Sequence, residues 1–363
     1  MGPALAAAGA SDATGREFIL AAAAGYTLMG RVAAPYGPMQ ARGWMSSGFW
    51  GPGGGAATAA RLMRLDAEET AAAISLGASA ATGPFQYFYD QTEDRRLVVA
   101  RAASSAVGAA HLARLGEHGA AHAYEGPAGL FKLADPKVVV DPVAIAANFS
   151  RLEGPLYLYP KFYSASSSIL PTLEGFARLE RAGQLPRSGI SAVVLRESPV
   201  RGAVLAAKLA KFEEPRNLIG ARMNYAFMTA LYLLRGDAGP DAVTEATLTD
   251  ADVIGLAREV TFEPIDDSMP ASVVVRYRDG RQIVVPPNII DITGPAPFAA
   301  EARQAKFALL TKSLGPARSQ RLKTLAAELP QATSMRAWAA DVDAVLRGPQ
   351  AAPVRCGPAA RSR

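Results

Sequence analysis

The chain has 363 residues, half of them hydrophobic and a fifth charged, with a net charge of +5. This composition is typical of a globular protein of one or two domains and excludes general disorder. The basic residues are dispersed and form no stripe with aromatic residues, so we expect no nucleic-acid partner. Cys356 is the single cysteine, which excludes an intrachain disulfide and cysteine-rich zinc or iron–sulfur sites.

No apolar stretch approaches the roughly 20 residues of a membrane span; the longest are short segments such as 18–24. The first ten residues are apolar but lack the basic region of a signal peptide. We therefore expect a cytoplasmic protein with no membrane partner.

Alanine-rich segments predict helices over most of the first 150 residues, because alanine loses almost no side-chain entropy in a helix. Ser11 or Asp12 is the predicted cap of the first long helix, and Asp66 with Glu69 forms a predicted capping box. The predicted helical segments are 18–32, 51–65, 67–76 and 98–115.

The pattern changes after about Pro136 to a mixture of β-prone and helical segments. Residues 138–140 are β-prone, 189–198 and 260–265 read as strands, and 200–212 reads as a helix. Residues 271–285 predict a hairpin, with Asp279-Gly280 in a type I′ turn. Helices return over 297–329 and 333–346.

This order predicts a mostly α fold with an α/β part, a large helical domain joined to a smaller α/β domain. We assign residues 1–150 to the first part of the helical domain and 151–296 to the α/β domain. The helical domain then resumes over 297–350, and 351–363 form a disordered tail.

Two patterns were tested for cofactor or metal binding. The glycines within 51–55 lack the following lysine of a phosphate-binding loop, so close helix packing is the expected role. His118 and His122 have helical i, i+4 spacing, but Gly119 and the predicted helix end at Gly116 oppose a shared helix, and no third ligand is apparent. We expect neither a metal nor a cofactor.

Two segments carry candidate polar sites. Arg95-Arg96 follows the acidic pair Glu93-Asp94, so these arginines either form local ion pairs or grip a carboxylate bidentately. Lys161 lies between tyrosines and precedes a serine-rich stretch that either lines a pocket or forms a turn.

Several segments, in order and spacing from about residue 15 to 345, together resemble the MmgE/PrpD family. Residues 25–32 resemble "GYEVAGRV", and 125–131 resemble "EGPGGFF". The other segments that carry the resemblance are 42–48 with 51–65, 66–78, 95–106, 157–176, 223–226 and 305–307. The resemblance implies a large helical domain, a smaller α/β lid domain and an active site between them. It also implies metal-independent acid–base chemistry on a small di- or tricarboxylic acid, such as dehydration of methylcitrate or decarboxylation of cis-aconitate.

The positions that match the family's proton-transferring residues differ here. Its histidines fall on Met45, Val98 and Ser166, and its lysines on Arg95 and Tyr157. Its D-D-T-H segment would precede residue 15 and is not found in this chain. Arginine keeps a charge for a carboxylate but does not deprotonate, and methionine and valine transfer no protons.

The resemblance and the residues lead to these candidates: substrate binding by Arg95, Arg96, Ser46 and Ser166, and catalysis by Lys161, Tyr157 or Tyr225. We interpret the chain as a divergent lyase or isomerase acting on a small di- or tricarboxylic acid. The alternatives are a non-catalytic paralogue that binds a ligand or partner, and a truncated reading frame. We also expect a homo-oligomer, most simply a dimer, because the alanine-rich faces of 16–32 and 51–64 would otherwise be partly uncovered.

Overall fold

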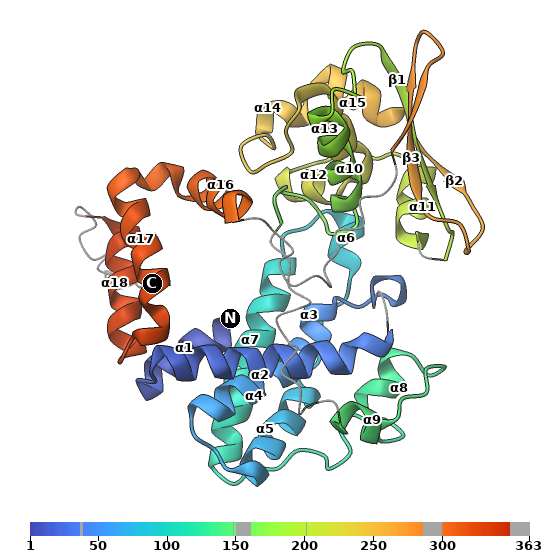
Figure 1. Cartoon of the computed structure of the whole chain (residues 1–363). Coiled ribbons are helices and arrows are strands. Elements are labelled where there is room, and N and C mark those ends of the chain that lie inside the picture. Colours follow the sequence, from blue (N-terminus) through green and yellow to red (C-terminus); the bar gives the residue numbers. More distant parts are fainter. Residues whose placement is uncertain (37–38, 148, 150–160, 201, 286–299, 349–363) are drawn as a thin grey trace, which may run out of the picture.

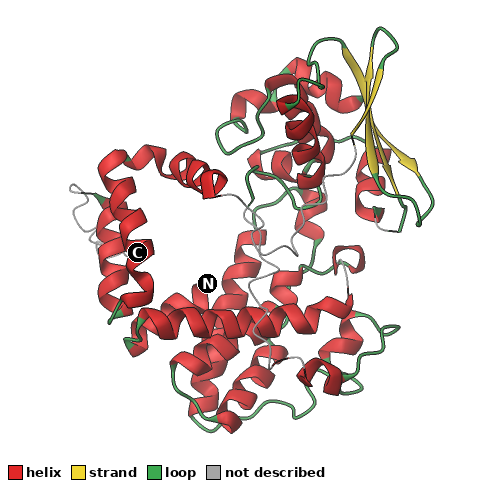
Figure 2. Ribbon diagram, in the orientation of Figure 1, coloured by secondary structure: helices red, strands yellow, loops and turns green. Residues whose placement is uncertain are grey.

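The computed structural model describes residues 1–36, 39–147, 149, 161–200, 202–285 and 300–348. The N-terminal part is mostly helical, and the C-terminal part combines helices with a four-stranded mixed sheet (Figure 1, Figure 2). The predicted fold class is therefore confirmed. The exact limits that we assign to the domains stay a prediction.

The helices of the N-terminal part pack around a core of alanines, to which Phe18, Leu62 and Met335 add larger side chains. Such small side chains let helix axes approach closely. α4 lies at the centre, against α1, α2, α5 and α7. The helices are α1 Gly2–Ser11, α2 Gly15–Ala33, α3 Ser46–Phe49, α4 Gly51–Leu62, α5 Ala67–Ser79, α6 Gln86–Asp90, α7 Arg95–Arg114, α8 Leu130–Ala134 and α9 Pro142–Ala147.

The helix caps agree with the sequence at one predicted start and differ at another. Asp66 and Glu69 form the expected capping box of α5. The cap predicted at Ser11 or Asp12 is wrong, because Thr14 caps α2 and forms a capping box with Glu17. Asp12 instead ends α1 in the left-handed conformation, which aspartate tolerates because its short polar side chain can form local hydrogen bonds.

The sheet has strand order β2-β1-β3-β4, with β1 parallel to β2 and the other pairs antiparallel. Its strands are β1 Ile190–Glu197, β2 Val260–Pro264, β3 Ser272–Tyr277 and β4 Gln282–Val285. The helices of the C-terminal part beside this sheet are α10 Leu170–Arg181, α11 Ala203–Ala210, α12 Leu218–Met223, α13 Tyr225–Arg235, α14 Glu245–Leu248 and α15 Ala251–Arg258. α13 is buried from Tyr225 to Leu233, so it forms the centre of this part.

The predicted hairpin is present as β3 and β4, but its turn is of another type. The amide of Gly280 donates to the carbonyl of Tyr277, and Gly280 has a φ of 86°. Asp279 does not have the positive φ that a type I′ turn requires. The loop is instead a turn followed by a left-handed glycine, and the Asp279 carboxylate accepts a bond from the amide of Arg281.

The strand expected from the β-prone residues 138–140 is absent from the structure. Val138 and Val140 pack against an aromatic cluster around Trp50 and Phe131, while Val139 is 90% exposed. Alternation here half-buries two valines against this cluster, and none of the described strands pairs with the segment.

The C-terminal helices form an arm that returns to the N-terminus (Figure 1). The arm comprises α16 Ala300–Thr311, α17 Pro316–Glu328 and α18 Met335–Arg347. The amide of Gly15 donates to the carbonyl of Ala332, and the amide of Met335 donates to the carbonyl of Ala13. The single helix predicted over 297–329 is broken at Gly315, which has a φ of 79°.

Residues 15–36 are long and apolar enough, by length and composition, to cross a membrane. This finding differs from our expectation that every apolar stretch is too short. Core helices of soluble proteins pass the same test, and α2 packs here against α4 through Gly25 and Gly54. The compartment of the protein stays a prediction.

The approach of α2 to α4 supplies a test of the packing. A Cβ at Gly25 would lie 1.9 Å from Thr58 Oγ1 and 2.4 Å from the Gly54 carbonyl oxygen. We predict that Gly25→Ala lowers the free energy of unfolding by about 1–3 kcal/mol, the usual cost of overpacking. Chemical denaturation followed by circular dichroism measures the change.

Gly108→Ala in α7 is the matched control, because a Cβ there meets nothing within 4 Å. It should stabilise the protein by about 0.5–1 kcal/mol through helix propensity alone. Equal stabilisation by both substitutions would contradict the close approach of α2 and α4.

Candidate functional site

The first turn of α7 separates the two arginines that the sequence singled out. Arg96 is exposed and forms an ion pair with Glu93 at 2.8 Å. Arg95 is half-buried and lies against the C-terminal part, with its Nη1 3.8 Å from Met223 Sδ. Only Arg95 is therefore placed at the junction of the two parts of the chain.

Gln91 holds the two parts together beside this arginine. Its side-chain oxygen accepts a bond from the amide of Arg216 at 2.8 Å, and its carbonyl accepts one from Asn217 Nδ2 at 2.8 Å. Gln91 is buried and has a φ of 55°, a left-handed conformation that is uncommon for this residue type. These bonds place the end of α12, with Met223, against the start of α7.

The short segment that carries Lys161, before α10, lies against the end of α12. The amide of Ser166 donates to the carbonyl of Arg222 at 2.9 Å. Lys161 Nζ donates to the carbonyl of Ala165 at 3.2 Å, which holds the ammonium near this crossing. Lys306 of α16 adds a third cation from the arm, and its Nζ lies 5.7 Å from the centre of the Phe162 ring.

The charges of these three groups act on one another. Although Lys161 as a residue is exposed, burial of its ammonium lowers the pKa, and repulsion from Arg95 and from Lys306 lowers it further. Burial also lowers the pKa of Lys306. Within the described part of the chain, Arg95, Lys161 and Lys306 form no ion pair with an acid. We call these three residues the cation trio.

An apolar surface borders the trio where the family resemblance places histidines. Met45 and Val98 both face Gly83, since a Cβ there would lie 2.8 Å from Val98 Cγ1 and 3.4 Å from Met45 Cβ. Met45 also packs, with Met223, against the buried rings of Phe85, Tyr87 and Phe88. None of these described side chains transfers protons near neutral pH.

The remaining sequence candidates lie at different places. Ser46 is half-buried at the start of α3, next to Met45, and Ser166 is half-buried beside Arg222. Tyr225 is 2% exposed, and its hydroxyl shares a 2.8 Å bond with Thr172 Oγ1. Burial raises the pKa of Tyr225 well above its usual range, which opposes a role as a base. Tyr157 lies outside the described residues.

Sequence reasoning did not select Lys306 or Met223 as site residues, although both lie in segments that resemble the family. Arg222 was also missed, and its buried Nε has no hydrogen-bond partner among the described residues. No local pattern marks these residues, because each reaches the site only through the packing of α12 and α16 against distant elements.

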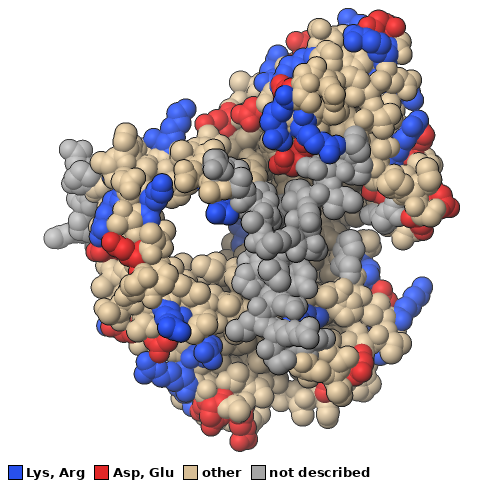
Figure 3. Space-filling model, viewed as in Figure 1, with Lys and Arg blue, Asp and Glu red and all other residues tan. Residues whose placement is uncertain are grey.

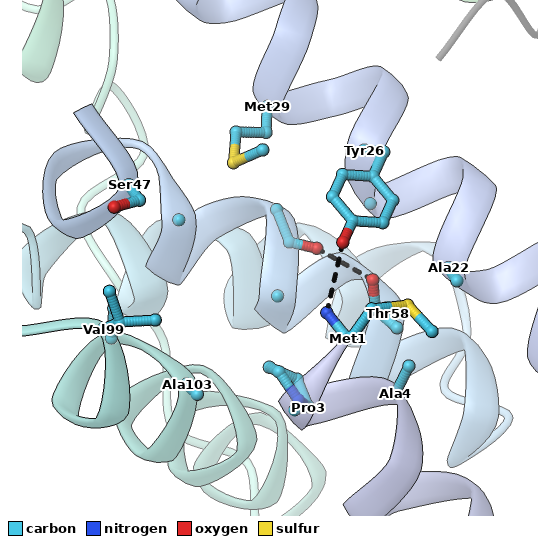
Figure 4. Close-up of a pocket in the computed structure, with 16 residues that line it drawn as sticks. Met1, Pro3, Ala4, Ala22, Tyr26, Met29, Ser47, Thr58, Val99 and Ala103 are labelled. Atoms are coloured by element: carbon cyan, nitrogen blue, oxygen red, sulfur yellow. Dashed lines mark hydrogen bonds between the residues drawn. The ribbon is translucent and has the colours of Figure 1, made fainter. Parts of the chain in front are cut away.

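A separate cavity of about 210 Å³ lies in the helical part, among α1, α2, α4 and α7 (Figure 4). Ser47 and Val99, the neighbours of Ser46 and Val98, line it together with Tyr26 and Met29. None of its lining residues has a charged side chain; the ammonium of Met1 lies 3.5 Å from the Tyr26 hydroxyl. The lining side chains therefore offer no charged partner for a carboxylate.

The histidines form no metal site in the structure. His111 pairs with Arg114 at 3.1 Å, and His122 pairs with Glu125 at 2.7 Å. Among the residues that the structure describes, no group of three or more His, Cys, Asp or Glu side chains is placed to hold a metal ion. That the protein needs no metal or cofactor stays an expectation.

The arrangement suits an anion more than a cation. Guanidinium and ammonium groups without an acidic partner repel one another, and a bound carboxylate removes that repulsion. Lys and Arg side chains are also visible at the edge of the opening between the arm and the rest of the molecule (Figure 3). Two lysines of this cluster have a lowered pKa, and only that of Lys161 is lowered by neighbouring cations as well as by burial.

Comparisons with known proteins address the family. A comparison with curated proteins gives no match. The model of the MmgE/PrpD N-terminal domain matches residues 1–139, and that of the MmgE/PrpD C-terminal domain matches residues 163–331. Both domains are present in the family's order and cover most of the chain, so this protein belongs to the MmgE/PrpD family.

Proposed function

We propose that this protein binds a small di- or tricarboxylic acid at the cation trio and is a divergent lyase or isomerase of its family. The observation that carries the proposal is the convergence of Arg95, Lys161 and Lys306 without an acidic partner among the described residues. The three cations come from α7, from the segment before α10, and from α16. One carboxylate would pair with Arg95 and a second with Lys306, which leaves Lys161 available for proton transfer.

Lys161 is the proposed proton-transfer group. Its lowered pKa increases the fraction of neutral amine at neutral to mildly alkaline pH, compared with an ordinary lysine. A neutral amine can take the proton from the carbon next to a bound carboxylate, while Arg95 stabilises the negative charge that develops on the carboxylate oxygens. In a lyase the electron pair then expels a group from the neighbouring carbon. In an isomerase the proton returns at another carbon.

The alternative is a paralogue that binds the acid without transforming it. Met45 and Val98 favour this alternative, because neither can move a proton where the family resemblance implies histidines. The two possibilities differ in one observable, the exchange of a carbon-bound hydrogen of the ligand.

The first prediction from this proposal concerns binding. A tricarboxylate such as tricarballylate at millimolar concentration should raise the melting temperature, because a ligand that binds only the folded state stabilises it. Arg95→Ala should reduce this shift by more than half, whereas Arg96→Ala should leave it nearly unchanged. Differential scanning fluorimetry measures both variants.

Arg96 is a matched control because it has the same charge, lies next to Arg95 and pairs with Glu93 at the surface. If both substitutions reduce the shift equally, the ligand responds only to the overall positive charge of the protein and not to Arg95 in particular. If no di- or tricarboxylate changes the melting temperature, the proposed site is wrong.

The second prediction concerns chemistry. We expect no dehydration of 2-methylcitrate and no decarboxylation of cis-aconitate above background, because general acid–base groups contribute about 100- to 10,000-fold each and several are replaced here. Proton NMR in D2O follows both reactions and also detects exchange at carbon. Exchange that disappears in Lys161→Gln would favour the enzyme, and its absence for every bound acid would favour the non-catalytic paralogue. Robust turnover of either acid would contradict the prediction.

We also propose that the chain forms a homo-oligomer, but through a different surface from the one expected. The face of 51–64 is covered within the chain by α1, α2, α5 and α7. Large apolar side chains are instead exposed along α7 and at its C-cap, where Leu97, Leu112 and Leu115 are 54%, 46% and 78% exposed. Such side chains along one helix favour association.

Sedimentation velocity at micromolar concentration should therefore show a dimer or a larger assembly. Leu112→Arg combined with Leu115→Arg should shift the protein toward monomer, because two charges would enter the contact. Leu133→Arg is the control, since this leucine is 57% exposed on α8. A wild-type monomer under these conditions would contradict the proposal.

A further inference from the structure

The cation trio has a hydrophobic border of a kind that citrate-like acids do not need. Met45 at the start of α3, Val204 in α11 and Met223 at the end of α12 are each half-buried. They pack on a base of buried rings, in which Phe85 and Phe88 stack at 4.9 Å and Phe85 meets Tyr87 edge-on at 5.3 Å. We call the three half-buried residues the apolar rim.

One contact ties the apolar rim to the cation trio. Arg95 Nη1 lies 3.8 Å from Met223 Sδ, and a thioether is only a weak hydrogen-bond acceptor. The guanidinium therefore keeps most of its hydrogen-bonding capacity for a carboxylate. A ligand whose carboxylate pairs with Arg95 brings its adjacent carbon atoms to the sulfur of Met223.

The rim joins both parts of the chain, since Met45 and the aromatic base come from the N-terminal part and Val204 and Met223 from the C-terminal part. Its methionines are unbranched and polarizable, so they adapt to hydrocarbon groups of different shape. A hydroxyl or a third carboxylate placed against them would lose bonds to water and gain none.

We infer that the preferred ligand is a dicarboxylic acid with a hydrocarbon substituent, an alkyl- or aryl-substituted succinate in its simplest form. The inference rests on the proposed function and narrows its ligand class. The two carboxylates pair with Arg95 and with Lys306, and the substituent covers Met45 and Met223. Citrate, with its hydroxyl and third carboxylate, fits this border less well.

The test is a series of ligands that differ only in the substituent. Isothermal titration calorimetry at fixed salt and pH compares succinate, methylsuccinate, butylsuccinate, phenylsuccinate and tricarballylate. Each methylene that becomes buried should tighten binding by up to about fourfold. Butylsuccinate and phenylsuccinate should therefore bind at least tenfold more tightly than succinate, and more tightly than tricarballylate.

Variants separate the apolar contribution from the ionic one. Met223→Ser and Met45→Ser should flatten the dependence on the substituent, and Arg95→Gln should weaken all five ligands by a similar factor. Met223→Leu and Met45→Leu keep the volume and hydrophobicity, so they should retain most of the dependence even if a serine variant is poorly folded. Met269→Ser, at a methionine that is 54% exposed in the loop between β2 and β3, is the control.

The outcomes distinguish this inference from the proposed function. If succinate and its substituted forms bind with equal affinity, or if tricarballylate binds best, the inferred preference for a hydrocarbon substituent is wrong. The proposed anion site is then still supported. If none of the five acids binds, the inference and the proposed function fall together.

Discussion

The close approach of α2 to α4 is the constraint on which the position of the site depends. Gly25 and Gly54 let the two helices touch through backbone atoms, and α4 in turn packs against α7. α7 begins with Arg95, so the glycine contact fixes indirectly where this guanidinium lies. α3, with Met45 and Ser46, leads directly into α4 and is positioned by the same packing.

The candidate site is assembled by long-range packing, with charge and hydrophobicity on opposite sides. Gln91 anchors the C-terminal part, α12 brings Met223 to Arg95, and α16 brings Lys306 to the segment of Lys161. The absence of a described acid leaves the cations in mutual repulsion, a condition that costs stability until an anion binds. Perturbed lysines of this kind are more common at functional sites than elsewhere on protein surfaces.

The sequence predicted the elements that local patterns encode. The capping box at Asp66, the strands at 190–197 and 260–264 and the hairpin at 272–285 are present in the structure. It failed where tertiary packing or a competing local bond decides. Thr14 rather than Ser11 or Asp12 caps α2, because Glu17 returns a bond to its amide, and 138–140 pack on aromatic rings without forming a strand.

The candidate site shows the same difference between what local patterns encode and what tertiary packing decides. Arg95 was selected for carboxylate binding and Lys161 for catalysis, and repulsion between their charges contributes to the lowered pKa of Lys161. Arg96 and Tyr225 were selected for equal reasons, yet one pairs with Glu93 at the surface and the other is buried beside Thr172. Lys306 and Met223 carry no local signal, since each becomes a site residue only when a segment distant in the chain packs beside it.

The most direct test of the cation trio is a crystal structure of the protein soaked with tricarballylate. The account predicts one carboxylate within hydrogen-bond distance of the Arg95 guanidinium and another near Lys161 Nζ and Lys306 Nζ, with carbon atoms of the ligand beside Met223. Ligand density in the cavity next to Tyr26, or an ordered Arg95 with no ligand at saturating concentration, would contradict it.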